Sequence, residues 1–244
     1  MLFRSDITKL TKPARKLLPL KKCGAVIVAA GSASRMGGID KVMAELRGEP
    51  MIRRTVRNFQ NCDAISEIVV VTRPDLMKEI SRLCAGYDKL KTVVAGGKSR
   101  QESVSLGLDA LSEDVKLAAV HDGARPFADW QLIDRCIRAA NTYSAAAPAI
   151  PVKDTIKVVE GRIVKSTPDR ATLYAVQTPQ VFDFDLLRGA LTKAEADGAA
   201  VTDDCSAVER LGMSIKIVEG DERNIKITTP LDLKIAELFL EDMQ

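Results

Sequence analysis

The stretch that decides the fold reads Ala29-Ala30-Gly31-Ser32-Ala33-Ser34-Arg35-Met36-Gly37-Gly38-Ile39-Asp40-Lys41, and it directly follows the apolar run at residues 25–28. An apolar run that ends in glycine and small residues predicts a buried strand leaving the carboxyl edge of a sheet. Open α/β sheets bind their ligands at that edge. Small side chains let backbone N–H groups approach an anion, and two cations stand in the same loop. The stretch therefore predicts a phosphate-binding loop.

Two alternatives apply to this loop. A glycine loop after a first strand can serve packing alone. The named phosphate-loop motifs do not fit, because Gly31 lacks the G-x-G-x-x-G spacing and a Walker A loop would need glycine in place of Met36. The loop is therefore neither a dinucleotide-binding loop nor a Walker A loop.

Apolar runs and helical periods alternate along the rest of the chain. The runs are expected to be strands at residues 25–28, 68–71, 92–95, 117–120, 145–150 and 214–218, with helices at 50–61, 74–84, 100–108, 131–141, 185–196, 203–211 and 231–240. Right-handed crossovers then cover both faces of the sheet with helices. We predict one α/β domain with a three-layer, Rossmann-like, doubly wound and mostly parallel sheet.

The spacing of apolar residues changes after Pro151. Residues 155–159 and 162–165 alternate in polarity and flank Glu160-Gly161, which predicts a β-hairpin. A two-stranded ribbon is marginal by itself. We expect an arm at about residues 152–176 that packs on a second copy in a homodimer, although it could also lie on its own domain. Residues 23–244 then form one domain with this arm.

Residues 1–22 form a basic extension with seven Lys/Arg and one acid, against 29 basic and 32 acidic residues in the remainder. We expect this extension to be flexible or weakly helical, with contact to a membrane surface or a partner as the alternative. The near-neutral body gives no support for nucleic-acid binding. No apolar stretch approaches the roughly 20 residues of a membrane helix, so a soluble protein without membrane attachment is expected.

Cysteine and histidine usage narrows the chemistry. The chain has five widely spaced cysteines, which predict neither a disulfide framework nor a zinc site and fit a reducing cytoplasm. His121 is the single histidine, so a multi-histidine metal site is excluded. We interpret His121 as a structural residue.

Asp122 ends an otherwise apolar strand, where an unpaired carboxylate would be costly to bury. A carboxylate at this edge, followed by Gly123 and Arg125, suits a site where Mg²⁺ bridges protein and substrate phosphates. The alternatives are a helix cap or an ion pair with Arg125. Spacing alone does not decide whether the cationic residues of the loops, Arg35, Lys41, Arg170 and Lys226, meet at one edge.

At these residues the chain resembles the 2-C-methyl-D-erythritol 4-phosphate cytidylyltransferase family over residues 23–244. The matching motifs, in the family's order, are residues 29–41, Gly96-Gly97 with Arg100 and Ser103, residues 120–126, Pro168-Asp169-Arg170, residues 177–180, Thr202-Asp203 and residues 224–228. A single motif would be weak evidence. Their common order makes the resemblance specific.

The resemblance implies transfer of CMP from CTP to 2-C-methyl-D-erythritol 4-phosphate with release of pyrophosphate, in nonmevalonate isoprenoid synthesis. By resemblance, the catalytic residues are Arg35, Lys41, Arg170 and Lys226. The nucleotide would be bound by Ala29, Ala30, Gly31, Gly97, Arg100, Ser103 and Asp122, with Asp122 also holding Mg²⁺ or another divalent cation. The acceptor would be bound by Thr155, Arg125, Arg170, Thr202 and Lys226, with Arg170 reaching the site of the partner subunit.

Two other functions remain open from the sequence. Ribitol 5-phosphate cytidylyltransferase resembles this chain in many of the same motifs, but residues 168–174 favour the methylerythritol enzyme. A noncatalytic nucleotide-binding homologue is the alternative from another class. The joint presence of Lys41, Asp122, Arg170 and Lys226 argues against it, because a sensor need not keep a transition-state cation.

Overall fold

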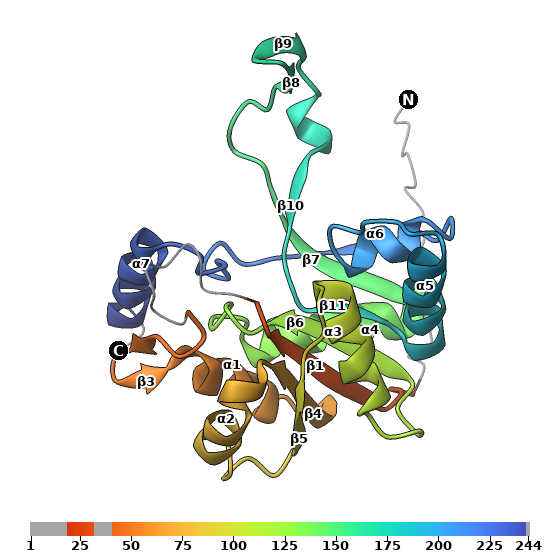
Figure 1. The fold of residues 1–244 in the computed structure, drawn as a ribbon. Coiled ribbons are helices and arrows are strands. Elements are labelled where there is room, and N and C mark those ends of the chain that lie inside the picture. The colour runs from red at the N-terminus through yellow and green to blue at the C-terminus, as the bar shows by residue number, and fades with distance from the viewer. Residues whose placement is uncertain (1–18, 32–40, 243–244) are drawn as a thin grey trace, which may run out of the picture.

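The computed structural model describes residues 19–31 and 41–242. Their centre is an eight-stranded sheet in the order β10-β7-β11-β6-β1-β4-β5, with β12 also paired to β7. The strands are β1 (Cys23–Ala29), β4 (Ile65–Thr72), β5 (Leu90–Ala95), β6 (Leu117–Asp122), β7 (Ala145–Pro151), β10 (Tyr174–Val176), β11 (Gln180–Asp183) and β12 (Lys216–Glu219). Strand β1 lies inside the sheet, between β6 and β4 (Figure 1).

The sheet is mostly parallel, as predicted. Strand β1 pairs in parallel with β4 and β6, β4 with β5, and β12 with β7. Strands β10 and β11 run antiparallel to their neighbours, and β11 separates β6 from β7. The sequence reasoning missed both, because residues 174–176 and 180–183 are too short to show a period.

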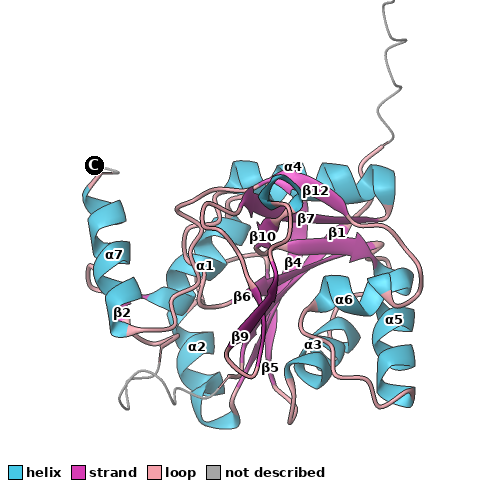
Figure 2. Ribbon diagram, turned by 90° about the horizontal axis from the view of Figure 1, so that it is seen from above, coloured by secondary structure: helices cyan, strands magenta, loops and turns pink. Residues whose placement is uncertain are grey.

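Helices cover both faces of the sheet (Figure 2). The helical segments are α1 (Met51–Gln60), η1 (Pro74–Leu76), α2 (Met77–Leu83), α3 (Arg100–Asp109), α4 (Trp130–Tyr143), η2 (Arg170–Thr172), α5 (Phe184–Ala196), α6 (Asp204–Glu209) and α7 (Pro230–Glu241). Helices α1, α2 and α4 share one buried cluster with Ala25 and Ile27, whereas α3, α5 and α6 share another with Val26. Alternate residues of β1 thus face opposite layers, which gives the predicted three-layer fold.

Local sequence signals fix the helix starts that bear on the site. The Ser99 hydroxyl accepts from the Glu102 N–H and starts α3, while the Asp129 carboxylate accepts from the Leu132 N–H and starts α4. Helix α7 begins with Pro230 after the N-cap Thr229. These caps satisfy N–H groups that would otherwise lack partners.

A short hairpin of β2 (Glu45–Leu46) and β3 (Glu49–Pro50) leads into α1. A second pair, β8 (Val158–Glu160) and β9 (Ile163–Ser166), forms the tip of an arm that projects from the domain (Figure 1). The arm leaves the sheet through β7 and returns through β10. It therefore extends away from its own domain.

Candidate functional site

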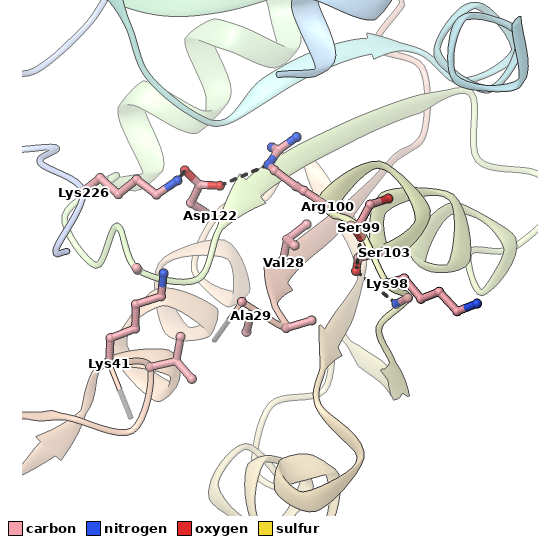
Figure 3. Close-up of a pocket in the computed structure, with 14 residues that line it drawn as sticks. Val28, Ala29, Lys41, Lys98, Ser99, Arg100, Ser103, Asp122 and Lys226 are labelled. Carbon is pink, nitrogen blue, oxygen red and sulfur yellow. Dashed lines mark hydrogen bonds and ion pairs between the residues drawn. The ribbon is translucent and has the colours of Figure 1, made fainter. Parts of the chain in front are cut away.

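A cavity of about 430 Å³ opens at the carboxyl ends of β1 and β6, beside the start of α3 (Figure 3). Its described lining consists of Val28, Ala29, Ala30, Gly31, Lys41, Val42, Gly97, Lys98, Ser99, Arg100, Ser103, Asp122, Ala124 and Lys226. Four of these side chains are basic and one is acidic. The cavity therefore favours an anionic ligand.

Close backbone packing builds the wall beside α3. The Gly97 N–H donates to the Ser103 hydroxyl over 3.1 Å, and the Lys98 N–H donates to the Glu102 carboxylate over 2.6 Å. A Cβ on Gly96 would lie 3.0 Å from the Ser103 Oγ and would collide with the Ala30 Cβ. Gly96 thus lets the segment before α3 approach the end of β1, and Gly97 lies against the Glu102 side chain at the start of α3.

Asp122 lies among three cationic side chains. Its carboxylate is 2.9 Å from the Lys226 Nζ, 3.5 Å from the Arg125 Nε and 3.7 Å from the Arg100 Nε. Burial by itself raises the pKa of Asp122, but Lys226 and Arg100 outweigh it and hold the pKa well below its usual range. The carboxylate is ionised at neutral pH.

Arg100 is held from the other side by Asp204, which is 1% exposed and lies 2.8 Å from the Arg100 Nη2. Burial lowers the pKa of Arg100, but the nearby Asp204 raises it above its ordinary value. Arg100 therefore joins the start of α6 to Asp122. The sequence reasoning missed Asp204, because an acid at the start of a helix usually indicates only a cap.

His121 lies under the site, with its Nδ1 2.9 Å from the Thr178 Oγ1 and its Nε2 3.0 Å from the Arg125 carbonyl. Burial lowers the pKa of His121 from 6.5 to about 4, so the ring is neutral at pH 7. A carbonyl only accepts, so we assign the ring proton to Nε2 and the Thr178 hydroxyl as the donor to Nδ1. The Asp122 N–H in turn donates to the Thr178 Oγ1 over 3.1 Å. His121 is structural, as interpreted from the sequence.

The structure gathers most of the predicted site residues at this cavity. Its lining includes Ala29, Ala30, Gly31, Lys41, Gly97, Arg100, Ser103, Asp122 and Lys226, and Arg125 contacts Asp122 from behind. Lys41 extends toward Asp122 (Figure 3), and a Cβ on Gly31 would lie 3.7 Å from the Lys41 Nζ. Loop, strand and C-terminal residues thus meet at one sheet edge.

Besides Arg125, four predicted residues are not in the described lining. Thr155 is exposed on the arm, and Arg170 in η2 donates to the Lys153 carbonyl over 2.8 Å. Thr202 lies before α6, where its N–H donates to the Ser206 hydroxyl over 3.1 Å. Arg35 lies outside the described residues. The roles expected for these four residues stay predictions.

A carboxylate surrounded by cations at the carboxyl edge of a doubly wound sheet defines the class as an α/β protein with an anion-binding cavity, an arrangement typical of nucleotide-binding enzymes. The sequence model of the 2-C-methyl-D-erythritol 4-phosphate cytidylyltransferase family matches residues 23–242. The chain belongs to this family, and the family is one of nucleotidyltransferases.

Individual relatives agree with the family assignment. The chain is 44% identical over 221 residues to 2-C-methyl-D-erythritol 4-phosphate cytidylyltransferase from Caldanaerobacter subterraneus, covering 88% of this chain and 97% of that protein. It is 46% identical over 220 residues to the protein of the same name from Geobacillus thermodenitrificans, covering 88% and 96%. The crystal structure of 4-diphosphocytidyl-2C-methyl-D-erythritol synthase from Anaerococcus prevotii superposes with a TM-score of 0.83 at 33% identity, covering 91% and 100%.

Within residues 19–31 and 41–242, no helix is both long and apolar enough to cross a membrane.

Proposed function

We propose that the protein transfers CMP from CTP to 2-C-methyl-D-erythritol 4-phosphate, giving 4-diphosphocytidyl-2-C-methyl-D-erythritol and pyrophosphate in the nonmevalonate isoprenoid pathway. The observation that carries this proposal is the ionised Asp122, which lies between Lys226 and Arg100 in a cavity with four basic residues. A substrate pair that brings two phosphate groups together needs such a set of charges. The family membership identifies the pair.

The nucleotide is assigned to the part of the cavity between β1 and α3. Residues 29–31 would present backbone N–H groups to the triphosphate, with Lys41 above them and Arg35 from the same loop. The cytosine would lie beside Gly97 and Ser103, with Arg100 next to it. This division follows the resemblance, and the close approach of Gly96 and Gly97 to their neighbours supports it.

A divalent cation fits Asp122. Among the residues described by the structure, no group of three or more His, Cys, Asp or Glu could hold a metal by itself. Mg²⁺ usually needs only one or two protein carboxylates, since substrate phosphates and water complete its coordination. The ionised Asp122 meets that requirement. A bound Mg²⁺ would neutralise part of the charge on the triphosphate.

The acceptor is assigned to the side of Asp122 that carries Arg125 and Lys226, with Thr202 expected nearby. We further propose that Arg170 and Thr155 come from the arm of a second subunit. The exposed fractions of Val158, Val159, Ile163 and Val164 at the tip lie between 48% and 66%. Four apolar side chains left open on a two-stranded ribbon favour a homodimer contact.

The reaction needs no general base, because the acceptor phosphate is already an anionic nucleophile. An acceptor phosphate oxygen forms a bond to the α-phosphorus of CTP, and the bond to the bridging oxygen breaks as pyrophosphate leaves with that electron pair. Negative charge increases on the α-phosphate oxygens and on the leaving group. Lys41 and Arg35 would stabilise this charge, while Lys226 and Arg125 would hold the acceptor.

The direct test measures pyrophosphate release from CTP with each polyol phosphate. We expect turnover with methylerythritol phosphate and little with ribitol 5-phosphate. Turnover with ribitol 5-phosphate alone would identify the related enzyme of cell-wall polymer synthesis. CTP binding without turnover of either acceptor would identify the noncatalytic homologue.

The shared site has its own test by subunit mixing. Lys41→Ala and Arg170→Ala are each expected to be nearly inactive, but dimers with one subunit of each type contain one intact site if the arm crosses over. Random reassortment of equal amounts then restores roughly a quarter of the wild-type activity. No recovery after verified subunit exchange would show that the arm serves its own subunit.

We also propose a cytoplasmic location, because the five cysteines of the chain are free and buried. The basic extension is proposed to lie outside the cytidylyltransferase domain, because the family match starts at residue 23. Fractionation of cells would test the location, and deletion of residues 1–18 would test whether turnover needs the extension.

A further inference from the structure

Asn224 is fully buried and precedes Lys226 by two residues, yet it does not line the cavity. Its backbone carbonyl accepts a hydrogen bond from the Arg125 Nη1 over 2.7 Å. Its Nδ2 donates to the Thr178 carbonyl over 2.9 Å and to the Gln177 Oε1 over 3.3 Å. The side chain of Asn224 thus joins its own loop to the segment before β11, and its backbone carbonyl joins that loop to Arg125 in the turn after β6.

The residues held by Asn224 are the ones that contact Asp122. The Thr178 Oγ1 accepts from the Asp122 N–H, and the Arg125 Nε lies 3.5 Å from the Asp122 carboxylate. Lys226, on the same loop as Asn224, lies 2.9 Å from that carboxylate. A shift of the Asn224 side chain therefore acts directly on Thr178, and it reaches Arg125 and Lys226 through the backbone of the loop at residues 224–226.

The orientation of the Asn224 amide is fixed, since both atoms facing its Nδ2 are acceptors. Its Oδ1 is buried and has no hydrogen-bond partner among the described residues. Such an unpaired group typically costs about 1–3 kcal/mol. An apolar residue would avoid this cost, so packing alone does not explain the amide.

We propose that Asn224 is a positioning residue, which holds Arg125 and Lys226 in place beside Asp122 without contacting substrate. This inference rests on the proposed function, in which those two cations bind the acceptor phosphate. It assigns no part of CTP binding to Asn224, because none of its contacts reaches Gly97 or Ser103.

The test variant is Asn224→Asp, which keeps the shape of the side chain but turns oxygen atoms toward the Thr178 carbonyl and the Gln177 Oε1. The matched control is Asn141→Asp. Asn141 also bonds to backbone groups through its amide, with Lys21 and Pro19, at the other edge of the sheet. Each variant replaces one side-chain amide with a carboxylate, but only Asn224 lies beside the residues assigned to the acceptor.

We expect Asn224→Asp to raise the KM for methylerythritol phosphate by about tenfold or more and to leave the KM for CTP within about twofold of wild type. Asn141→Asp should leave both values unchanged. Equal increases in both constants for Asn224→Asp, or no change in either, would overturn the proposal. The same assay measures turnover of methylerythritol phosphate by the wild-type enzyme. Failure of the proposed function would appear there, whereas failure of the positioning role would appear only in the Asn224→Asp variant.

A second readout does not depend on turnover. Acetylation of Lys226 by a soluble reagent, followed by mass spectrometry, reports whether its amine stays paired with Asp122. Labelling of Lys226 should become several-fold faster in Asn224→Asp but not in Asn141→Asp, and unchanged labelling would refute the positioning role. If Asn224→Asp does not fold, Gln177→Met removes the acceptor of the second Asn224 Nδ2 hydrogen bond, together with the two hydrogen bonds between the Gln177 side chain and the Asp221 backbone. It should change Lys226 labelling in the same direction, with no change counting against the proposal.

Discussion

His121 gives the sharpest test of the electrostatics under the site. It is the only histidine of the chain, and its side chain is fully buried between Phe59 and the turn after β6. Burial lowers its pKa from 6.5 to about 4, although the hydrogen bond to the Arg125 carbonyl and the charge of Asp122 oppose this shift. The positive charges of Arg125 and Lys226 lower the pKa of His121 as well. Protonation therefore favours the unfolded chain.

The sign and the size of the effect follow from linkage. Because the pKa in the folded state is lowered, the full stability is present above pH 6.5 and is lost as the pH falls toward 4. The whole shift corresponds to about 3 kcal/mol. Between about pH 7.5 and about pH 5.0, the unfolded chain takes up nearly one proton that the folded protein does not, which costs about 2 kcal/mol.

Urea unfolding at a series of pH values measures this loss. Acidic residues titrate mainly below about pH 5, so the window above it isolates the histidine. His121→Gln removes the titrating group and should reduce the pH-dependent loss to a few tenths of a kcal/mol, whatever its stability at neutral pH. If wild type and His121→Gln lose the same free energy of unfolding between the two pH values, the ring is not buried in its neutral form.

Three further predictions concern the cavity and its support. Lys41→Ala should lower kcat about a hundredfold, or about 3 kcal/mol, with little change in the Kd for CTP by calorimetry; equal losses in both would place its charge in ground-state binding. Asp122→Asn should make turnover require much more Mg²⁺, and full activity at low Mg²⁺ would exclude Asp122 as its ligand. Gly107→Ala should lower the free energy of unfolding by about 1–3 kcal/mol in urea, because the new Cβ would collide with Val26 and lie 2.8 Å from the Val71 Cγ2; unchanged stability would show that α3 can move.

Much of the fold could be predicted from the sequence because its signals are local. The run at residues 25–28 became the centre of β1, and the helical period at 131–141 became α4. Strand β11 could not be predicted in this way, since its four residues pair with β6 and β7 on either side. Its position depends on two partners that are remote in sequence, and no local propensity encodes such pairing.

The candidate site shows the same division. Asp122 was recognisable because a carboxylate at the end of an apolar strand needs a partner, and Gly31 because it lies in the small-residue loop that follows β1. Asp204 and Asn224 gave no such signal. An acid at a helix start and an amide in a loop are common surface features, and only their burial against Arg100, Thr178 and Arg125 gives them a role.

The sequence by itself determined the alternation of strands and helices, the small-residue loop after the first strand and the order of motifs that identifies the family. Tertiary structure alone decided which charges meet. Lys41, Arg100 and Lys226 are far apart in the chain, and they line one cavity with Asp122 because parallel strands end at one edge and α3 starts there. The spacing of apolar residues along the chain is a local property, whereas the free energy of a charge depends on its distance from every other charge in the folded molecule.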